Sequence, residues 1–361
     1  MIIGVPKEIK NNEYRVGLTP ESVKTLVSNE HEVFIQHNAG IEIGFSDTNY
    51  TNAGGKILET PQKIFESSEL IIKVKEPTPD ELPFLSEKHT LFTYLHLAGD
   101  KKQGLDLTVT GVTGIAYETV TSAEGSFPLL APMSAIAGQL SILVGSYHLL
   151  KHKKGKGTLI GSFGVLEPRI VTVIGAGVAG TEAIDKAIAN NAHVRVIDLS
   201  KKRLDELEAI YGKENIEYII STPNSISNAI SNSDLVIGSV YVVGRQAPKI
   251  VKKEMILAME PGTVMVDISI DQGGCFETSR PTTHDDPTFL THGIVQYCVT
   301  NMPGAVPLTA THALNHATLP YILDIANKGT ERALEEDEHL FNGLNVQSGK
   351  VVHEAVKESL K

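Results

Sequence analysis

Ile170-Val-Thr-Val-Ile174-Gly175-Ala-Gly177-Val-Ala-Gly180 is the stretch of sequence that decides the fold. Its first five residues are apolar and rich in β-branched side chains, which favours a buried strand. Three glycines with G-x-G-x-x-G spacing follow at once and open a helix-like stretch that runs to Asn190. A strand, a glycine-rich turn and a helix in this order indicate the first βαβ unit of a doubly wound sheet.

The glycine-rich turn also predicts a dinucleotide site, because glycines let the backbone approach a pyrophosphate whose charge the helix N-terminus favours. The next apolar run, His193–Ile197, is followed by Asp198, 18 residues after Gly180. A carboxylate there can bind the ribose 2′-hydroxyl and repel a 2′-phosphate, so we predict NAD as the cofactor. Two alternatives stay open: NADP, whose phosphate the basic residues 201–203 can neutralise, and a glycine turn that binds no nucleotide.

Similar apolar runs recur on both sides of this stretch and alternate with helix-like segments, the pattern of parallel sheets covered by helices. They are Met1–Val5, Glu32–Gln36, Leu70–Val74, Thr90–Leu95, Gly114–Tyr117, His193–Ile197, Glu217–Ile220, Leu235–Gly238, Thr263–Ile270 and Ile294–Tyr297. A chain of 361 residues exceeds the ~250 at which single cores stop growing. We therefore expect an α/β protein with two doubly wound, Rossmann-like domains.

Two chain segments outside these runs carry predictions of their own. Thr19 is a good N-cap and Pro20 suits the first helical position, so a helix should begin there. After residue 300 the strand-like runs stop and helical patterns follow. We expect this tail to fold back onto the first domain without contributing strands.

Composition narrows the class of protein. With 32 basic and 43 acidic residues the net charge is −11 and no basic run stands out, so we expect no nucleic-acid partner. The only cysteines, Cys275 and Cys298, cannot form a disulfide framework, and we expect buried thiols in a reducing compartment. Met1–Glu8 lacks the order of a signal peptide, which favours a cytoplasmic location.

Two further kinds of site are not expected. The uncharged residues 126–150 are numerous enough to cross a bilayer, but their Pro, Gly, Ser and His content predicts a buried connecting helix and no membrane partner. No spaced cluster of His, Cys or Asp residues suggests a metal site.

Four polar residues occupy positions where ligands bind in open α/β sheets, beyond the carboxyl ends of strands. Lys75, His96 and Asp271 each follow an apolar run, and Arg15 lies between the first strand and the first helix. Hydride transfer at an amino or keto carbon needs a fixed cation for a carboxylate, a group that polarises the reacting atom, and groups that move protons. The four residues match these needs. Each alone also fits a plain role: surface arginine, solvated lysine, packed histidine or N-capping aspartate.

Short motifs spread over the whole chain carry a family resemblance. They are Gly4-Val-Pro-Lys7-Glu8, Arg15-Val-Gly-Leu-Thr19-Pro20-Glu21, Lys73-Val-Lys75-Glu76-Pro77, Leu95-His96-Leu97-Ala98, Leu130-Ala-Pro-Met133-Ser134, Asp271-Gln-Gly-Gly274, Arg280-Pro-Thr-Thr-His284 and Asn301-Met302-Pro303-Gly304-Ala-Val-Pro307. In this order they resemble the alanine dehydrogenase family, which shares its fold with the NAD-binding part of proton-translocating transhydrogenases.

The resemblance implies an activity and residue roles. The activity is the reversible, NAD-dependent oxidative deamination of L-alanine to pyruvate and ammonium. Arg15 is implied to bind the substrate carboxylate, Lys75 to contact the reacting oxygen or nitrogen, and Met133 to pack against the substrate. His96 and Asp271 are implied to be the acid/base groups. Besides Gly175, Gly177 and Gly180, the residues implied to line the NAD site are Ser134, Val178, Asp198, Arg203, Ser221, Val240, Ile268, Arg280, Asn301 and Met302.

The resemblance also implies a domain organisation and an assembly. Residues 1–128 and 307–361 would form a discontinuous substrate domain, into which the NAD-binding Rossmann domain 129–306 is inserted, with Gly155 and Gly157 as a hinge. The implied assembly is a homohexamer. Three alternatives stay open: a transhydrogenase component with a membrane partner, an NAD-binding sensor without catalysis, and the same chemistry on glycine, serine or 2-aminobutyrate.

Overall fold

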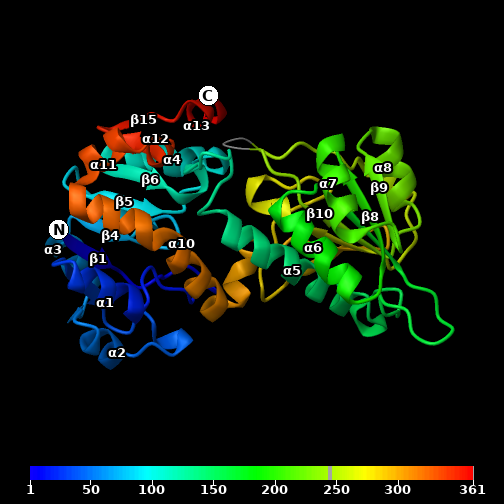
Figure 1. The fold of residues 1–361 in the computed structure, drawn as a ribbon, viewed down its shortest axis with the longest axis horizontal. Helices are drawn as coiled ribbons and strands as arrows, with labels where there is room; N and C mark the ends of the chain where they lie inside the picture. The colour runs from blue at the N-terminus through cyan, green and yellow to red at the C-terminus, as the bar shows by residue number, and fades with distance from the viewer. Residues whose placement is uncertain (243–245, 361) are drawn as a thin grey trace. The chain divides into compact units, whose positions relative to one another are not determined.

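The computed structural model describes residues 1–242 and 246–360, which form two compact units. Met1–Met133 and the chain from Gly304 onward build the first unit, and Ser134–Val242 with Gln246–Pro303 build the second. Each unit is a largely parallel sheet covered by helices (Figure 1). The predicted α/β class with two doubly wound sheets is confirmed.

The first unit contains an eight-stranded sheet in the order β15-β14-β6-β5-β4-β1-β2-β3. The strands are β1 (Ile2–Val5), β2 (Glu32–Gln36), β3 (Lys56–Leu58), β4 (Leu70–Ile72), β5 (Thr90–Thr93), β6 (Thr113–Ala116), β14 (Leu344–Gln347) and β15 (Lys350–Val351). Strands β1 to β6 run parallel. Because β2 and β4 pair with opposite edges of β1, the strand order reverses between β1 and β4, where ligands bind in such sheets.

Helices from both ends of the chain cover this sheet. They are α1 (Pro20–Ser28), α2 (Asp47–Asn52), α3 (Pro61–Ser67), α4 (Lys101–Thr110), α10 (Pro307–Lys328), α11 (Thr330–Glu336), α12 (Glu338–Phe341) and α13 (Glu354–Ser359), with 3-10 turns η1 (Ile41–Ile43), η2 (Leu82–Phe84), η3 (Leu97–Gly99) and η4 (Tyr117–Thr119). The predicted start of α1 is confirmed, because the Thr19 side chain accepts a hydrogen bond from the Ser22 N–H and Pro20 opens the helix.

The prediction that the tail adds no strands is wrong. β14 pairs antiparallel with β6, and β15 pairs antiparallel with β14. In Figure 1 the red end of the chain, β15 and α13, lies beside the cyan α4 and β6. Val346 and Val356 are buried in the same apolar cluster as Leu91 and Leu107, so the tail completes the core of the first unit.

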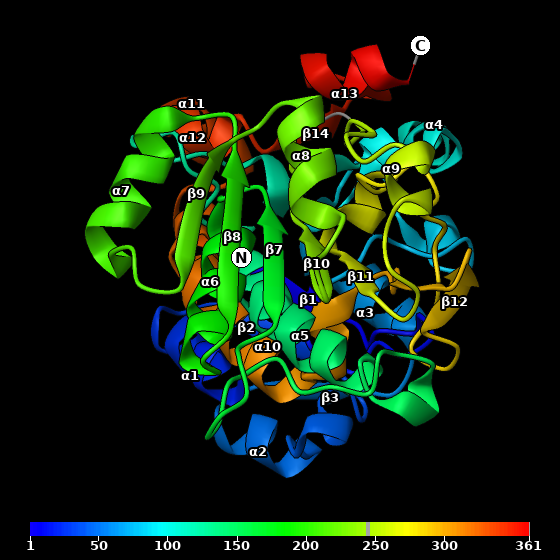
Figure 2. The same ribbon diagram turned by 90° about the vertical axis from the view of Figure 1, so that its right-hand side faces the viewer.

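The second unit repeats the doubly wound plan with the strand order β12-β13-β11-β10-β7-β8-β9. Its strands are β7 (Ile170–Ile174), β8 (His193–Asp198), β9 (Ile216–Ile220), β10 (Leu235–Gly238), β11 (Val264–Asp267), β12 (Thr288–Thr291) and β13 (Ile294–Tyr297). All run parallel except β12, and Figure 2 shows β9, β8, β7, β10 and β11 side by side. The strand order reverses here between β7 and β10, next to the glycine-rich turn.

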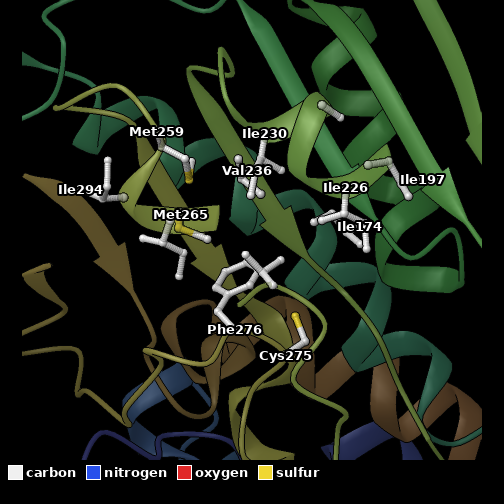
Figure 3. Packing of buried hydrophobic residues seen from close by; sticks show 13 residues of the cluster. Ile174, Ile197, Ile226, Ile230, Val236, Met259, Met265, Cys275, Phe276 and Ile294 are labelled. Carbon is white, nitrogen blue, oxygen red and sulfur yellow. The ribbon is translucent and has the colours of Figure 1, made fainter. Parts of the chain in front are cut away.

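Helices on both faces of this sheet enclose a second core. They are α6 (Val178–Ala189), α7 (Lys201–Tyr211), α8 (Pro223–Ile230) and α9 (Lys253–Leu257), together with most of α5 (Ala131–His148) and the 3-10 turns η5 (Lys151–Lys153), η6 (Ile268–Gln272) and η7 (Met302–Ala305), the last of which also enters the first unit. Figure 3 shows Ile226 and Ile230 of α8 packed with Val236, Met265 and Phe276. The two cysteines are buried and free, as predicted.

Two expectations concern the chain between the units. The uncharged stretch forms α5, and none of the helices among the described residues is both long and apolar enough to cross a membrane. The turn at Gly155 and Gly157 lies inside the second unit, where the Lys156 N–H donates to the Gly262 carbonyl. A Cβ on Gly155 would approach the His148 carbonyl oxygen to 2.3 Å. This tightly packed turn is not where the chain passes between units, so the hinge prediction is not supported.

Candidate functional site

Three of the predicted site residues, two for substrate binding and one for catalysis, meet at the carboxyl edge of the first sheet. Strands β1, β4 and β5 are parallel neighbours, so their carboxyl ends lie at the same edge. Arg15 follows β1, Lys75 is three residues beyond β4, and His96 is three residues beyond β5. The structure therefore brings these residues together at the reversal of strand order.

Arg15 is buried and fixed by a carboxylate. Its Nε donates to Glu13 Oε1 at 2.7 Å and its Nη2 to Glu13 Oε2 at 2.5 Å, while Nη1 lies 3.2 Å from Met133 Sδ. Burial disfavours the charged form, but the charge of Glu13 outweighs it and raises the pKa of Arg15. The guanidinium is thus a permanent, oriented cation with Met133 against it, as anchoring a carboxylate requires.

Lys75 is held through its backbone by a second buried carboxylate. Glu8 Oε1 accepts the N–H groups of Val74 at 2.6 Å and Lys75 at 3.3 Å. Lys73 Nζ joins Glu8 at 3.2 Å to Glu81 at 2.7 Å. Within residues 1–242 and 246–360 the Lys75 ammonium itself has no hydrogen bond or ion pair, although the side chain is largely buried. It is a cation whose surroundings fix its position and leave its donors for a ligand.

His96 adopts the left-handed backbone conformation, with φ 49° and ψ 32°, which residues other than glycine rarely adopt. The buried Glu118 accepts its N–H at 2.5 Å. The imidazole stacks on the Tyr94 ring at a centroid distance of 5.6 Å and an angle of 6°. Strained residues held by their surroundings cluster at functional sites, which fits a histidine that moves protons.

The carboxyl edge of the second sheet carries the glycine-rich turn, whose three glycines have different surroundings. A Cβ on Gly175, where φ is 96°, would approach the Ser239 carbonyl oxygen to 2.7 Å, and a Cβ on Gly180 would approach the Gly175 carbonyl oxygen to 1.9 Å. A Cβ on Gly177 would meet no atom within 4 Å. Gly177 is the N-cap of α6 and no side chain caps this helix end. An open backbone beside uncapped helical N–H groups fits a pyrophosphate.

Asp198 and Arg203 flank this turn. Asp198 ends β8, and its Oδ2 accepts the Ala176 N–H at 2.7 Å. Arg203 donates from Nε to the Ala176 carbonyl at 2.9 Å and from Nη2 to Thr181 Oγ1 at 2.8 Å. The carboxylate therefore lies directly beside the turn, where a ribose bound after the pyrophosphate would reach it.

The remaining predicted cofactor residues of the second unit are spread along the same edge. They follow strand ends or lie at a helix start: Ser134, Val178, Ser221, Val240, Ile268, Asn301 and Met302. Asp271 in η6 accepts the Asn301 N–H at 3.3 Å. The Arg280 guanidinium lies 4.3 Å from the centre of the Phe289 ring. No group of three or more His, Cys, Asp or Glu residues is placed to hold a metal ion in the described part of the chain.

Several buried carboxylates that organise these edges were not singled out from the sequence. Asp267 is one: its Oδ2 accepts the Cys275 N–H at 2.9 Å and the Ser279 hydroxyl at 2.5 Å, which shapes the loop that carries Asp271. Burial raises its pKa. Glu8, Glu13 and Glu118 have the same role in the first unit. Glu118 follows a strand-like run, so the strand-end rule that selected Lys75 and His96 would also have selected it.

Comparison with known proteins gives consistent matches over the whole chain. The model of the alanine dehydrogenase/PNT N-terminal domain matches residues 4–137, and that of the alanine dehydrogenase/PNT C-terminal domain matches residues 141–354. Alanine dehydrogenases from Halomonas elongata and Mycolicibacterium smegmatis are 47% and 48% identical, covering 99% and 100% of this chain and 96% and 97% of their own length. That of Bacillus subtilis is 46% identical over 100% of this chain and 95% of its own.

Solved structures agree with these matches. An L-alanine dehydrogenase superposes with a TM-score of 0.93 at 46% identity, covering 99% of each chain. A transhydrogenase from Sinorhizobium meliloti superposes with a TM-score of 0.81 at 22% identity, covering 98% of this chain and 100% of its own, which shows the shared fold alone. On these matches, the chain belongs to the alanine dehydrogenase/PNT family.

Proposed function

We propose that this protein is an alanine dehydrogenase, which converts L-alanine, NAD and water into pyruvate, ammonium, NADH and a proton, and catalyses the reverse reaction. The observation that carries the proposal is the identity of 46–48% to alanine dehydrogenases over at least 99% of the chain. The convergence of Arg15, Lys75 and His96 at one sheet edge supports it.

The substrate residues act by charge and position. Arg15, fixed by Glu13, binds the substrate carboxylate, and Met133 packs beside it. Lys75 donates to the oxygen or nitrogen on the reacting carbon and stabilises the negative charge that develops there. His96 and Asp271 accept and return the protons of the amino group and of the attacking water.

NAD is the proposed cofactor, and when bound it accepts the hydride from the substrate Cα. The open backbone at Gly177 and the N-terminus of α6 would bind its pyrophosphate, and Asp198 its adenosine ribose. The remaining residues of the proposed NAD site are Ser134, Gly175, Val178, Gly180, Arg203, Ser221, Val240, Ile268, Arg280, Asn301 and Met302. The first unit is accordingly proposed as the substrate domain, with the boundaries 1–128 and 307–361, and 129–306 as the NAD domain.

The charges on α7 favour NAD over NADP. Lys201 pairs with Asp205, Lys202 lies 4.0 Å from Glu206, and Arg203 lies 3.1 Å from the same carboxylate. Each of these cations has a carboxylate partner on its own helix, which weakens its attraction for a 2′-phosphate, while the Asp198 carboxylate repels one.

We further propose a cytoplasmic homohexamer, on the family resemblance. An exposed apolar segment, residues 159–166, supports self-association. Four of its side chains are each more than half exposed, and the backbones of two of them form a β-bridge: Leu159, Val165, and the bridged pair Phe163 and Leu166. Exposed apolar clusters of this kind mark contact surfaces. Sedimentation velocity of the purified protein tests the hexamer, and a monomer at micromolar concentration would contradict it.

The activity test follows NADH by its near-ultraviolet absorbance. NADH should form from L-alanine and NAD faster than from glycine, L-serine or 2-aminobutyrate, should not form appreciably with NADP, and should be consumed with pyruvate and ammonium. A protein that binds NADH but oxidises none of these amino acids would overturn the proposal in favour of a sensor or a transhydrogenase component.

A further inference from the structure

His96 and Glu118 form a closely packed pair at the carboxyl edge of the first sheet. Glu118 lies in η4 directly after β6, next to β5, which leads to His96. Its Oε1 accepts the His96 N–H at 2.5 Å, and both carboxylate oxygens lie 3.2 Å from the Leu95 nitrogen. The same Oε1 is 4.0 Å from His96 Nδ1. One buried carboxylate therefore contacts both the backbone and the ring of His96.

The backbone contact matters because His96 is in the left-handed region. Residues with a Cβ enter this region only where the surroundings compensate for the strain. A charge-assisted hydrogen bond from the His96 N–H to a carboxylate is such a compensation. Without it, the segment would be free to return to an ordinary conformation that points the imidazole elsewhere.

The ring contact selects which nitrogen faces the substrate. Nδ1 is on the side of Glu118, and the Tyr94 ring covers one face of the imidazole. Nδ1 is thus the ring nitrogen in contact with the carboxylate. A carboxylate beside one nitrogen of a catalytic histidine orients the ring, so that the opposite nitrogen exchanges the proton.

We propose, on the basis of the proposed dehydrogenase function, that Glu118 is a positioning residue for catalysis: it holds His96 in its left-handed conformation and fixes Nε2 as the nitrogen that exchanges protons with the substrate. It does not touch the substrate itself and acts only through His96. The neighbouring charged groups do not replace it. Glu76 interacts electrostatically with His96, but its Oε1 is paired with Lys10. His353 of the tail interacts electrostatically with Glu118, and burial lowers the pKa of His353.

A matched pair elsewhere in the same unit separates catalysis from plain structural support. Asp47 accepts the N–H of Asn38, another left-handed residue with φ 58°, at 2.9 Å, and its second oxygen lies 2.5 Å from His37 Nδ1. This pair follows β2, which pairs with the side of β1 opposite to β4 and β5, the strands that lead to Lys75 and His96. Asp47→Asn removes an equivalent carboxylate without touching His96, so it is the control.

The test is steady-state kinetics of Glu118→Gln and Asp47→Asn in the full-length protein, with NADH affinity and melting temperature measured on each. Glu118→Gln should lower kcat roughly 10- to 100-fold, whereas the KM for alanine and the NADH affinity should each change by less than about threefold. Asp47→Asn should leave kcat unchanged. Glu118→Asp, which keeps the charge, should recover part of the loss and serves as the second variant if Glu118→Gln folds poorly.

A double-mutant cycle with His96→Ala shows whether Glu118 acts through His96. If it does, Glu118→Gln should lower the residual rate of His96→Ala no further. An equal loss in both backgrounds, or a wild-type kcat in Glu118→Gln, overturns the inference while leaving the proposed function in place. If the wild-type protein itself forms no NADH from alanine, the proposed function fails, and this inference fails with it.

Discussion

At the scale of single residues, substitutions of Gly177 and Gly180 should distinguish a glycine required for cofactor binding from one required for the fold. Gly180→Ala should lower the free energy of unfolding by about 1–3 kcal/mol, because its Cβ would lie 1.9 Å from the Gly175 carbonyl oxygen. Gly177→Ala should leave stability within about 0.5 kcal/mol, because its Cβ meets no protein atom and its φ of −69° suits alanine. It should nevertheless weaken NADH binding roughly tenfold, since the methyl group occupies the approach to the helix N-terminus.

Urea unfolding and NADH fluorescence titration measure the two quantities. If Gly177→Ala is destabilised, or if it binds NADH as tightly as the wild type, the open side of the turn does not face the pyrophosphate.

Asp198 tests cofactor discrimination in the same turn. Asp198→Ala removes a charged acceptor of a ribose hydroxyl, an interaction worth about 1.5–3 kcal/mol, so NAD affinity should fall roughly 10- to 100-fold. Affinity for NADP should fall less, because the repulsion of its phosphate also disappears. The ratio of kcat/KM with NAD and with NADP measures this change. An unchanged ratio would show that Asp198 only supports the turn through the Ala176 N–H.

At this scale the sequence predicts which residues lie at the strand ends but not what holds them there. Lys75 and His96 were predictable because each follows an apolar run in a parallel sheet, and Arg15 because it lies in the loop between the first strand and the first helix. Their partners depend on pairings that no local pattern encodes: Glu8 is 66 residues from Val74, and Glu118 is 22 from His96. Glu13, two residues from Arg15, carried no signal of its own.

At the scale of elements, helix α10 fixes the loop that carries Arg15. Asn315, which is buried, accepts the Thr19 N–H at 2.8 Å and donates to the Gly17 carbonyl at 3.2 Å. Asn315→Ala leaves both groups without a partner and should cost about 1–3 kcal/mol of stability. Because the loop loosens, the KM for alanine should also rise.

The control for this prediction is Asn327→Ala near the other end of the same helix, whose side chain, among the described residues, bonds to His31. Kinetics and urea unfolding should separate the two variants. In Asn315→Ala both the KM for alanine and the stability should change, whereas in Asn327→Ala the KM should stay as in the wild type. An unchanged KM in Asn315→Ala would mean that the remaining contacts suffice to hold Arg15.

His89 links α3 to the loop before β5 and makes stability depend on pH. Its Nε2 lies 2.8 Å from the Phe65 carbonyl and its Nδ1 accepts the Ser86 N–H at 2.9 Å, so the folded state needs a neutral ring. Burial lowers its pKa from 6.5. The unfolded chain therefore binds the proton more readily, and the stability present above pH 6.5 is lost as the pH falls below it.

His89→Gln, which cannot be protonated, should reduce this loss. Urea unfolding of both proteins at about pH 8 and about pH 5.5 measures it. His148 and His353 also have a lowered pKa and remain in the variant, so the dependence should become weaker without disappearing. An identical slope in the two proteins would remove His89 as a source.

The strands that sequence reasoning missed are short: β3, which lies parallel to β2, and three strands of hairpins, β12, β14 and β15. β12 and β13 are joined by His292 and Gly293, and β14 and β15 by Ser348 and Gly349, with φ positive at both residues of each turn. Two-residue turns of this type connect antiparallel strands. The turn was therefore a usable signal, whereas the strands are too short for their alternation to stand out from the helical tail.

At the scale of the whole molecule, the two units should behave differently when expressed separately. Residues 134–303 contain a complete sheet order and their own buried core, so this fragment should fold and bind NADH without oxidising alanine. Residues 1–133 lack β14, which covers the edge of β6, and lack Val346 and Val356 of their core. This fragment should therefore remain unfolded, which far-ultraviolet circular dichroism would detect.

A fusion of residues 1–133 to 304–361 through a flexible linker is the decisive third protein. It restores β14, β15 and α10, so it should unfold cooperatively in urea, and Val346→Asp within it should abolish that transition because Val346 is fully buried. A cooperative transition in 1–133 alone would show that the tail is an accessory to a self-sufficient core. If instead only the fusion folds, the first unit is a true discontinuous domain, and residues 304–361 must be present before the residues that hold Arg15 and His96 acquire their final positions.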